Sequence, residues 1–311
     1  MRGIFFLFLI LSTFIGCKPS KTIIILSDEI KESVIYLSSD DLAGRNTGTG
    51  GIEKAAKYIE QQLKSFGVKP YFESYRDDFK AKGLDAFNIV GYIEGTDSKL
   101  KNEFVIISAH YDHIGYAKAV DNDSIANGAN DNASGTSSVL AIAKYFAAKK
   151  KNKRSIMFVL FSAEELGLLG SEHLAKRLKN ENLDLYSMLN FEMTGVPLKD
   201  RDYVAFLSGY DLSNMASKIN EYVDSNLIGL SDIAKKYNLF VASDNYAFYK
   251  EFGLPCQSLS SCDLSNYDYY HHVDDEADKL DYDFMASLIN KIIPAIEKMC
   301  DTPTKEIEMY E

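Results

Sequence analysis

The sequence predicts an α/β protein built on a central mixed, mostly parallel twisted sheet. Three apolar runs, at 104–113, 154–167 and 186–195, have the β-branched and aromatic enrichment and the scarcity of charge that mark buried strands. Between the first two, the stretch SSVLAIAKYFAAK (137–149) repeats its apolar residues every three or four positions, as a helix does when it packs on a sheet. This alternation of strand and helix is the signature of parallel βαβ units.

Length and composition indicate one globular domain. The chain has 311 residues, of which 46% are hydrophobic and 25% charged, and it contains no repeat, low-complexity tract or Pro-rich linker. Its formal net charge of −11 argues against a general nucleic-acid binder, because such proteins displace counterions from phosphates with an excess of Lys and Arg. We therefore expect no nucleic-acid partner.

The first 17 residues differ in kind from the rest. Arg2 precedes an apolar run that ends at Gly16 and Cys17 and is shorter than the roughly 20 residues of a membrane span, a pattern typical of a signal peptide. The stretch FIGC also resembles a bacterial lipobox, in which the Cys becomes the lipidated first residue of the mature protein. This resemblance implies a lipoprotein signal peptide over 1–17, a tether over 18–26, and a lipid on Cys17 that anchors the chain to a membrane of the bacterial cell envelope.

The remaining three cysteines, Cys256, Cys262 and Cys300, are an odd number in a compartment that permits disulfides. A bridge between Cys256 and Cys262 and three unpaired thiols are both compatible with their spacing. The sequence leaves this question open.

The N-terminal third predicts helices and one antiparallel sheet edge. Residues 28–42 and 52–67 have helical periodicity, and the second helix should end at Gly67. The intervening GRNTGTGG (44–51) lacks the spacing of a phosphate-binding loop, so a structural loop is the better interpretation. Turn signals between the short strand-like pieces of 71–100 favour antiparallel strands.

Each of the three buried strands runs into residues that can hold a metal ion. These residues are His110, then Glu164 with Glu165, then Glu192. Ligands of open α/β sheets bind outside the carboxyl ends of the strands, so we expect one site assembled from distant parts of the chain. His110 and Asp112 form an H-x-D pattern, in which the imidazole faces the site and the carboxylate orients its other nitrogen. Asp131, in the small-residue stretch NDNASG, can reach the same site.

The pair Glu164-Glu165 is the sharpest signal of a metal centre. Two adjacent carboxylates after an apolar strand repel each other and are costly to bury unless a cation compensates them. One carboxylate can then bind the ion while the other handles the proton of a bound water. The alternative is an ordinary helix start, because 166–178 has helical periodicity and acidic residues favour a first turn.

The last candidate segment, YDYYHHVDDEADKLDYDF (267–284), is predicted to be a loop followed by a helix from about Asp281. It carries His271 and His272. Adjacent histidines seldom both reach one metal, so we expect one ligand here.

These motifs, in this order, resemble the metallo-aminopeptidases of peptidase family M28, which contain two zinc ions. The resemblance covers nearly all of 27–311 and rests on the N-terminal helix region DDLAGRNTGTGGIEKAAKYIEQQLKSFGV and on AHYDHIG, NGANDNASGTSSVL, FSAEELGLLGSEHL, LNFEMTG, SDNYAFYKEFGLP and YYHHVDDEADKLD. It implies a single domain with the three-layer αβα fold of zinc-dependent exopeptidases.

The resemblance also implies a role for each site residue. Asp131 is expected to bridge two Zn²⁺ ions, with the other ligands being His110 and Glu192 for one ion and Glu165 and His271 for the other. Glu164 is expected to be the general base. His271, rather than His272, matches the family's ligand, and Tyr270 matches a tyrosine that helps hold the oxyanion in some members, although a packing role fits this residue equally well. The family usually has Asp where this chain has Glu192.

The function implied is that of a metal-dependent exopeptidase, an aminopeptidase that removes N-terminal residues from peptides. Two alternatives stay open. Glutaminyl cyclases share the architecture but use one zinc and a Trp-lined pocket, whereas this chain has no Trp. A non-catalytic surface lipoprotein would have no reason to keep the full ligand set. The residue preferred at the substrate's N-terminus and the oligomeric state are not set by any single position.

Overall fold

The computed structural model describes residues 23–311, so the signal peptide and residues 18–22 of the expected tether lie outside the described residues. The end of that tether packs on the domain: Ile25 is buried, and its backbone N–H and C=O pair with the Asn290 side chain at 3.0 and 2.9 Å. Helix α1 (Ser27–Leu37) follows directly. Among the described residues, no helix is both long and apolar enough to cross a membrane.

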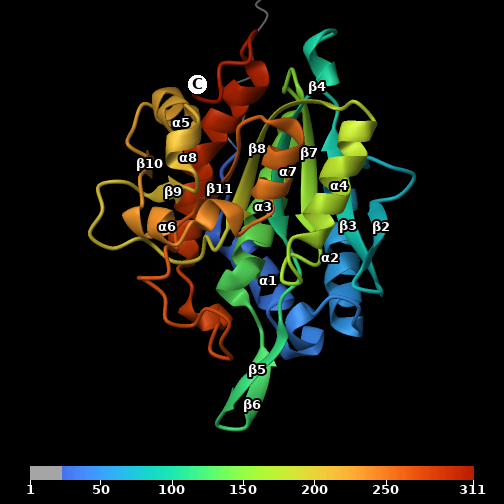
Figure 1. The fold of residues 1–311 in the computed structure, drawn as a ribbon, viewed down its shortest axis with the longest axis vertical. Coiled ribbons are helices and arrows are strands. Elements are labelled where there is room, and N and C mark those ends of the chain that lie inside the picture. Colours follow the sequence, from blue (N-terminus) through green and yellow to red (C-terminus); the bar gives the residue numbers. More distant parts are fainter. Residues whose placement is uncertain (1–22) are drawn as a thin grey trace, which may run out of the picture.

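A nine-stranded mixed sheet forms the centre of the molecule (Figure 1). Its strands are β1 (Lys69–Pro70), β2 (Arg76–Ala81), β3 (Leu84–Ile93), β4 (Glu103–His110), β7 (Ser155–Phe161), β8 (Asp184–Glu192), β9 (Ala205–Leu207), β10 (Ile228–Gly229) and β11 (Cys256–Ser260). Strands β7, β4, β8 and β11 lie side by side in parallel, whereas β3 joins β7, and β9 joins β11, in antiparallel fashion. The predicted mixed sheet, with its antiparallel edge from 71–100, is confirmed.

Helices cover both faces of this sheet, which gives the predicted three layers. The helices are α1, α2 (Gly50–Phe66), α3 (Gly135–Lys149), α4 (Leu169–Asn180), α5 (Met215–Val223), α6 (Asp232–Lys236), α7 (Asn245–Phe252) and α8 (Tyr282–Asp301). Successive residues of β4 show the two cores that result. Val105 and Ile107 belong to the core that includes residues of α1, α2, α3 and α8, while Ile106 belongs to the core that includes residues of α4 and α7.

Two of the predicted helix ends are confirmed by their local chemistry. The first predicted helix, 28–42, is shorter than expected: α1 ends at Leu37, where Ser38 leaves the helical conformation, and a separate 3₁₀ turn covers Asp40–Arg45. Helix α2 ends at Gly67, whose φ of 81° is the left-handed conformation that glycine adopts without strain. Helix α8 begins after Asp281, whose carboxylate accepts a hydrogen bond from the Phe284 N–H at 2.9 Å.

A separate hairpin and three thiols complete the fold. Strands β5 (Gly115–Val120) and β6 (Asp123–Ala126) pair with each other and extend away from the body of the molecule (Figure 1). Cys256, Cys262 and Cys300 are all buried and free, so of the two alternatives for these cysteines the structure has unpaired thiols.

The loop predicted at 44–51 carries a completely buried arginine. The Arg45 guanidinium donates hydrogen bonds of 2.5–2.9 Å to the backbone carbonyls of Leu37, Tyr111, Asn127 and Gly128. Burial lowers the pKa of Arg45 to about 10. This one side chain therefore ties α1 to the chain segments that follow β4 and precede α3.

We expect Arg45→Met to lower the free energy of unfolding by at least about 3 kcal/mol, because each buried carbonyl left without a donor costs roughly 1–3 kcal/mol. Urea unfolding measures the change. Arg201→Met is the matched control, since the Arg201 side chain is 36% exposed, and its effect should stay within about 0.5 kcal/mol. An equal loss in both variants would contradict the assigned role.

Candidate metal centre

Five residues expected to hold metal come together at the carboxyl ends of the central strands. His110 is the last residue of β4 and Glu192 the last of β8, while Glu165 lies in the turn that follows β7. Asp131 lies in the irregular turn that precedes α3, and His271 comes from the loop before α8. Parallel pairing of β7, β4 and β8 brings the three strand ends to one edge of the sheet.

The first group of ligand atoms surrounds His110. Its Nε2 lies 3.1 Å from Glu192 Oε1 and 3.3 Å from Asp131 Oδ1, and the three ligand atoms lie within 4.8 Å of one another. The longer carboxylate of Glu192 therefore reaches the group. Ser243 Oγ donates a 2.7 Å hydrogen bond to its other oxygen, Oε2.

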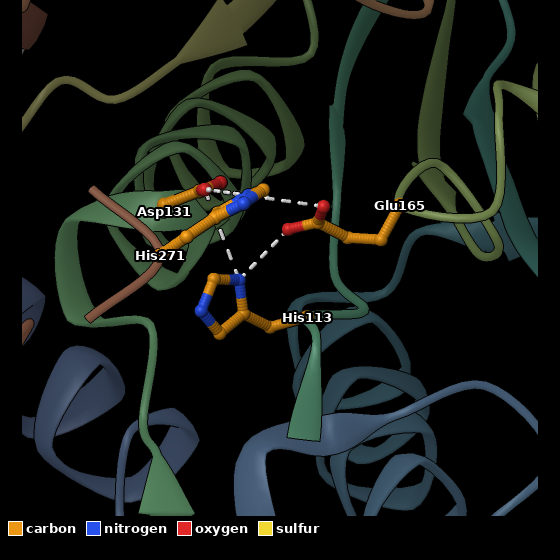
Figure 2. A group of neighbouring side chains, drawn as sticks. All are labelled: His113, Asp131, Glu165 and His271. Carbon is orange, nitrogen blue, oxygen red and sulfur yellow. Dashed lines mark hydrogen bonds and ion pairs between the residues drawn. The ribbon is translucent and has the colours of Figure 1, made fainter. Parts of the chain in front are cut away.

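The second group contains one residue more than the sequence analysis predicted. Figure 2 shows His113, Asp131, Glu165 and His271 pointing toward one another. His271 Nε2 lies 3.3 Å from Asp131 Oδ2 and 3.1 Å from Glu165 Oε2. The Nδ1 of His113 lies 2.9 Å from Glu165 Oε1. His113 was missed, although the motif AHYDHIG contains it.

Asp131 faces both groups with different oxygens. Its Oδ1 is directed at His110 and its Oδ2 at His271. The backbone around it is held by Asp275, whose carboxylate accepts hydrogen bonds from the N–H groups of Asn130 and Asp131 at 2.7 and 3.0 Å. A carboxylate held in this way can bridge two cations.

Asp112 has a wider role than the H-x-D pattern indicates. His110 Nδ1 lies 3.1 Å from the Asp112 backbone oxygen and 3.7 Å from its carboxylate Oδ1. The carboxylate also accepts hydrogen bonds from the backbone N–H groups of Glu164 and Glu165, at 3.2 and 3.4 Å. Asp112 therefore fixes the turn that carries both glutamates, and its carbonyl orients His110.

Burial and neighbouring charges shift the pKa values of two carboxyl groups of the site in opposite directions. Burial raises the pKa of Glu164 well above the usual value; His110 opposes this effect, and the carboxylates of Asp244 and Glu192 add to it. Burial also acts to raise the pKa of Asp131, but the ion pairs of its carboxylate with His110 and His271 hold this pKa well below the usual value. Glu164 thus has the environment of a proton acceptor, and Asp131 that of a permanent anion.

The residues around Glu164 include a buried carboxyl group that the sequence analysis did not assign. Asp244 has no exposed surface, and neither of its carboxylate oxygens has a hydrogen-bond partner within 23–311. Burial raises its pKa to about 7, against the opposing effect of His110. The native state therefore binds this proton more tightly than the unfolded chain, and stability falls as pH rises between about 4 and 7.

We expect Asp244→Asn to stabilise the metal-free protein at pH 8 by on the order of 4 kcal/mol, because a shift of about three pKa units corresponds to that difference. At pH 4, where the parent carboxyl is protonated, the advantage should disappear. Urea unfolding in the presence of chelator measures it. Asp274→Asn, at a residue whose side chain is 49% exposed, is the control, and a pH-independent difference for Asp244→Asn would contradict the prediction.

The adjacent histidines of the C-terminal loop, His271 and His272, point in different directions. His271 lies in the site, whereas His272 points to Asp274, so the choice of His271 agrees with the geometry. Tyr270 stacks on the His271 ring with the ring centroids 3.9 Å apart, and it lines the pocket beside the ligand groups. Its side chain is thus placed at the site.

A pocket lies over these groups. His110, Asp131, Glu164, Glu165 and Glu192 form its polar floor. Its walls include apolar residues from several elements, namely Met193, Phe206, Leu239, Cys262 and Leu264. The pocket can therefore hold an apolar group beside a cationic centre.

The donor set fits zinc. Histidine nitrogens and carboxylate oxygens about 2.0–2.1 Å from a tetrahedral Zn²⁺ lie about 3.3 Å from each other, close to the 3.1–3.3 Å that separate His110 Nε2 and His271 Nε2 from their carboxylate oxygens. His271 Nε2 is buried and makes no geometrically acceptable hydrogen bond to any described residue. A cation would satisfy this nitrogen and offset the repulsion between the carboxylates.

The sequence model of peptidase family M28 matches residues 88–296, more than half of the chain, and these residues include every proposed ligand. The chain belongs to peptidase family M28.

Curated relatives agree with this assignment. A "Probable zinc metalloprotease" of Pyrenophora teres f. teres is 28% identical over 179 residues, which cover 55% of this chain and 37% of that protein. "Leucine aminopeptidase 1" of Paracoccidioides brasiliensis is 28% identical over 203 residues, 61% of this chain and 47% of that one. The chain thus spans less than half the length of these relatives.

Solved structures share the M28 fold of this chain. The LapA aminopeptidase of Legionella pneumophila superposes with a TM-score of 0.69 at 22% identity, covering 89% of this chain and 72% of that one. The glutaminyl cyclase of Porphyromonas gingivalis superposes with a TM-score of 0.67 at 17% identity, covering 88% and 98%. At these identities the likeness establishes the zinc-exopeptidase fold and no particular activity.

Proposed function

We propose that this M28 protein is a zinc-dependent aminopeptidase that removes the N-terminal residue from peptides. The observation that carries the proposal is the pair of ligand groups sharing Asp131, with Glu164 beside them at the floor of the pocket. Peptide hydrolysis needs an activated water, an acceptor for its proton and a cation for the developing oxyanion. The groups at this site can supply all three.

One zinc ion would be held by His110, Asp131 and Glu192, and the other by Asp131, Glu165 and His271. Together the two ions would lower the pKa of a shared water and polarise the scissile carbonyl. Glu164 accepts the proton of the attacking water, and its raised pKa suits this task. It then gives the proton to the leaving amine. Asp112 keeps Glu164 in place through its backbone N–H, and the pocket receives the N-terminal side chain of the substrate.

The number of metal ions tests the proposal most directly. Elemental analysis of a soluble form without residues 1–17 should give about two zinc ions per chain. About one ion per chain would support a cyclase-like site, and none after metal resupply would support the non-catalytic surface lipoprotein.

The glutaminyl cyclase alternative is compatible with the fold, which this chain shares with the Porphyromonas gingivalis enzyme as well as with aminopeptidases. A substrate assay separates the two activities. An aminopeptidase releases free amino acids from a panel of aminoacyl substrates, whereas a cyclase releases ammonia from an N-terminal Gln and leaves the peptide bond intact.

We further propose that the protein is a lipoprotein of the bacterial cell envelope, made with a signal peptide over 1–17 and anchored through Cys17. The support is the apolar leader and the stretch FIGC. Replacing Cys17 by Ser should move the protein from the detergent-extracted membrane fraction to the soluble fraction. An unchanged distribution would exclude the anchor.

A further inference from the structure

His113 lies in the second ligand group but was not predicted to be part of the site. It has no exposed surface, and its backbone N–H donates to the Arg45 carbonyl at 3.3 Å. Its ring lies against Gly128, where an added Cβ would come within 2.5 Å of His113 Cδ2. Backbone on either side therefore fixes the ring, with Nδ1 facing Glu165 and Asp131 (Figure 2).

His113 and His271 approach the same carboxylates differently. His271 Nε2 is nearly equidistant from Asp131 Oδ2 and Glu165 Oε2, at 3.3 and 3.1 Å, as a ligand between two other ligands would be. His113 Nδ1 instead makes a 2.9 Å hydrogen bond to Glu165 Oε1 and stays 3.8 Å from Asp131 Oδ2. The contact of His113 is thus with one carboxylate oxygen.

The other ring nitrogen decides between a ligand and a hydrogen-bond donor. A neutral histidine that binds metal through Nδ1 carries its proton on Nε2, and that N–H normally donates to a carbonyl or carboxylate. His110 shows the expected pattern, with its second nitrogen 3.1 Å from the Asp112 carbonyl. His113 Nε2 is buried without a partner in the described part of the chain, so a proton there would be an orphaned donor. A proton on Nδ1 is instead satisfied by Glu165.

We propose that His113 is a positioning residue, whose Nδ1–H holds Glu165 Oε1 so that Oε2 is presented to the metal bound by Asp131 and His271. The inference rests on the proposed two-metal function. With this role for His113, the glutamate ligand of each group has one oxygen held by a hydrogen-bond donor: Ser243 donates to Glu192, and His113 donates to Glu165. Each metal then has three protein residues and keeps an open position for water and substrate.

The test compares His113→Leu with His113→Asn in the metal-loaded protein. Leu removes the donor at similar size, whereas the Asn side-chain N–H₂ can occupy the place of Nδ1. Competition with a chelator should show that His113→Leu lowers the affinity for one of the two zinc ions by about 10- to 100-fold, the usual effect of losing a hydrogen-bond partner of a metal ligand. His113→Asn should restore affinity to within about threefold of the parent. His173→Leu, which replaces a histidine outside both ligand groups, is the matched control.

X-ray absorption of the zinc-loaded protein supplies the deciding readout. His113→Asn should leave the number of imidazoles bound to zinc unchanged, and a loss of one imidazole per chain would overturn the proposal by making His113 a ligand. Parental zinc affinity in a folded His113→Leu variant would also overturn it. If that variant does not fold, the imidazole count of His113→Asn decides. Failure of the parent itself to bind zinc would contradict the proposed function instead, so the two failures are distinguishable.

Discussion

Glu164→Gln should lower kcat by about a hundred- to ten-thousandfold while both metal ions stay bound. The amide has the size of the carboxylate but cannot accept the proton of the attacking water, and general-base catalysis contributes about this much to rate. Glu164 belongs to neither ligand group, so metal binding should be unaffected. Turnover of an aminoacyl substrate and elemental analysis on the same preparation measure the two quantities.

Glu172→Gln is the control for this substitution. Glu172 lies in α4, where its side chain is 33% exposed and pairs with Lys250. This variant should retain parental kcat. Normal turnover of Glu164→Gln would refute its role as general base, and loss of a metal ion would show that it is a ligand.

Asp131→Ala should abolish turnover by removing both metal ions rather than one. Its two oxygens face different groups, Oδ1 toward His110 and Oδ2 toward His271, so each group loses a ligand at once. Glu165, Glu192 and Glu164 then repel one another without a shared cation between them. We expect metal content to fall well below one ion per chain after desalting, and activity to fall to background.

Asp278→Ala provides the comparison, because that side chain is 74% exposed and outside the site. It should bind two ions and turn over substrate at the parental rate. Retention of one firmly bound ion in Asp131→Ala would mean that one group assembles without the bridge, and the shared-ligand arrangement would then be wrong.

The parts of the fold that could be predicted are those that short-range patterns determine. Buried parallel strands have continuous apolar runs, so β4, β7 and β8 could be located, and the sheet edge then brought His110, Asp131, Glu165 and Glu192 together. A family resemblance supplied His271, which no strand pattern places. The state of the three cysteines could not be predicted, because spacing does not determine whether two side chains meet.

The contacts that were not predicted depend on side-chain orientations in loops and on pairs of residues distant in sequence, neither of which periodicity determines. His113 lies beyond the end of β4, where no pattern of two or of 3.6 residues sets which way a side chain faces. The Asp112 carboxylate was predicted to orient His110, and it does lie 3.7 Å from His110 Nδ1. Its hydrogen bonds from the N–H groups of Glu164 and Glu165, distant in sequence, were not predicted. Asp275 likewise acts on the turn of Asp131 from the far end of the chain.

The hairpin formed by β5 and β6 has a consequence for engineering the protein. It interrupts the chain between His113 and Asp131, yet its base is fastened to the domain, with the Asn46 side chain bonded to the Ile114 carbonyl at 2.7 Å and Arg45 holding the Asn127 carbonyl at 2.6 Å. Its tip at Asp121 and Asn122 is exposed and already adopts positive φ. A peptide tag or fluorescent label grafted at this tip would lengthen the hairpin without moving the residues on either side of its stem. The same tip offers an attachment point for immobilising the protein at the end opposite to α5 and the C-terminal residues (Figure 1).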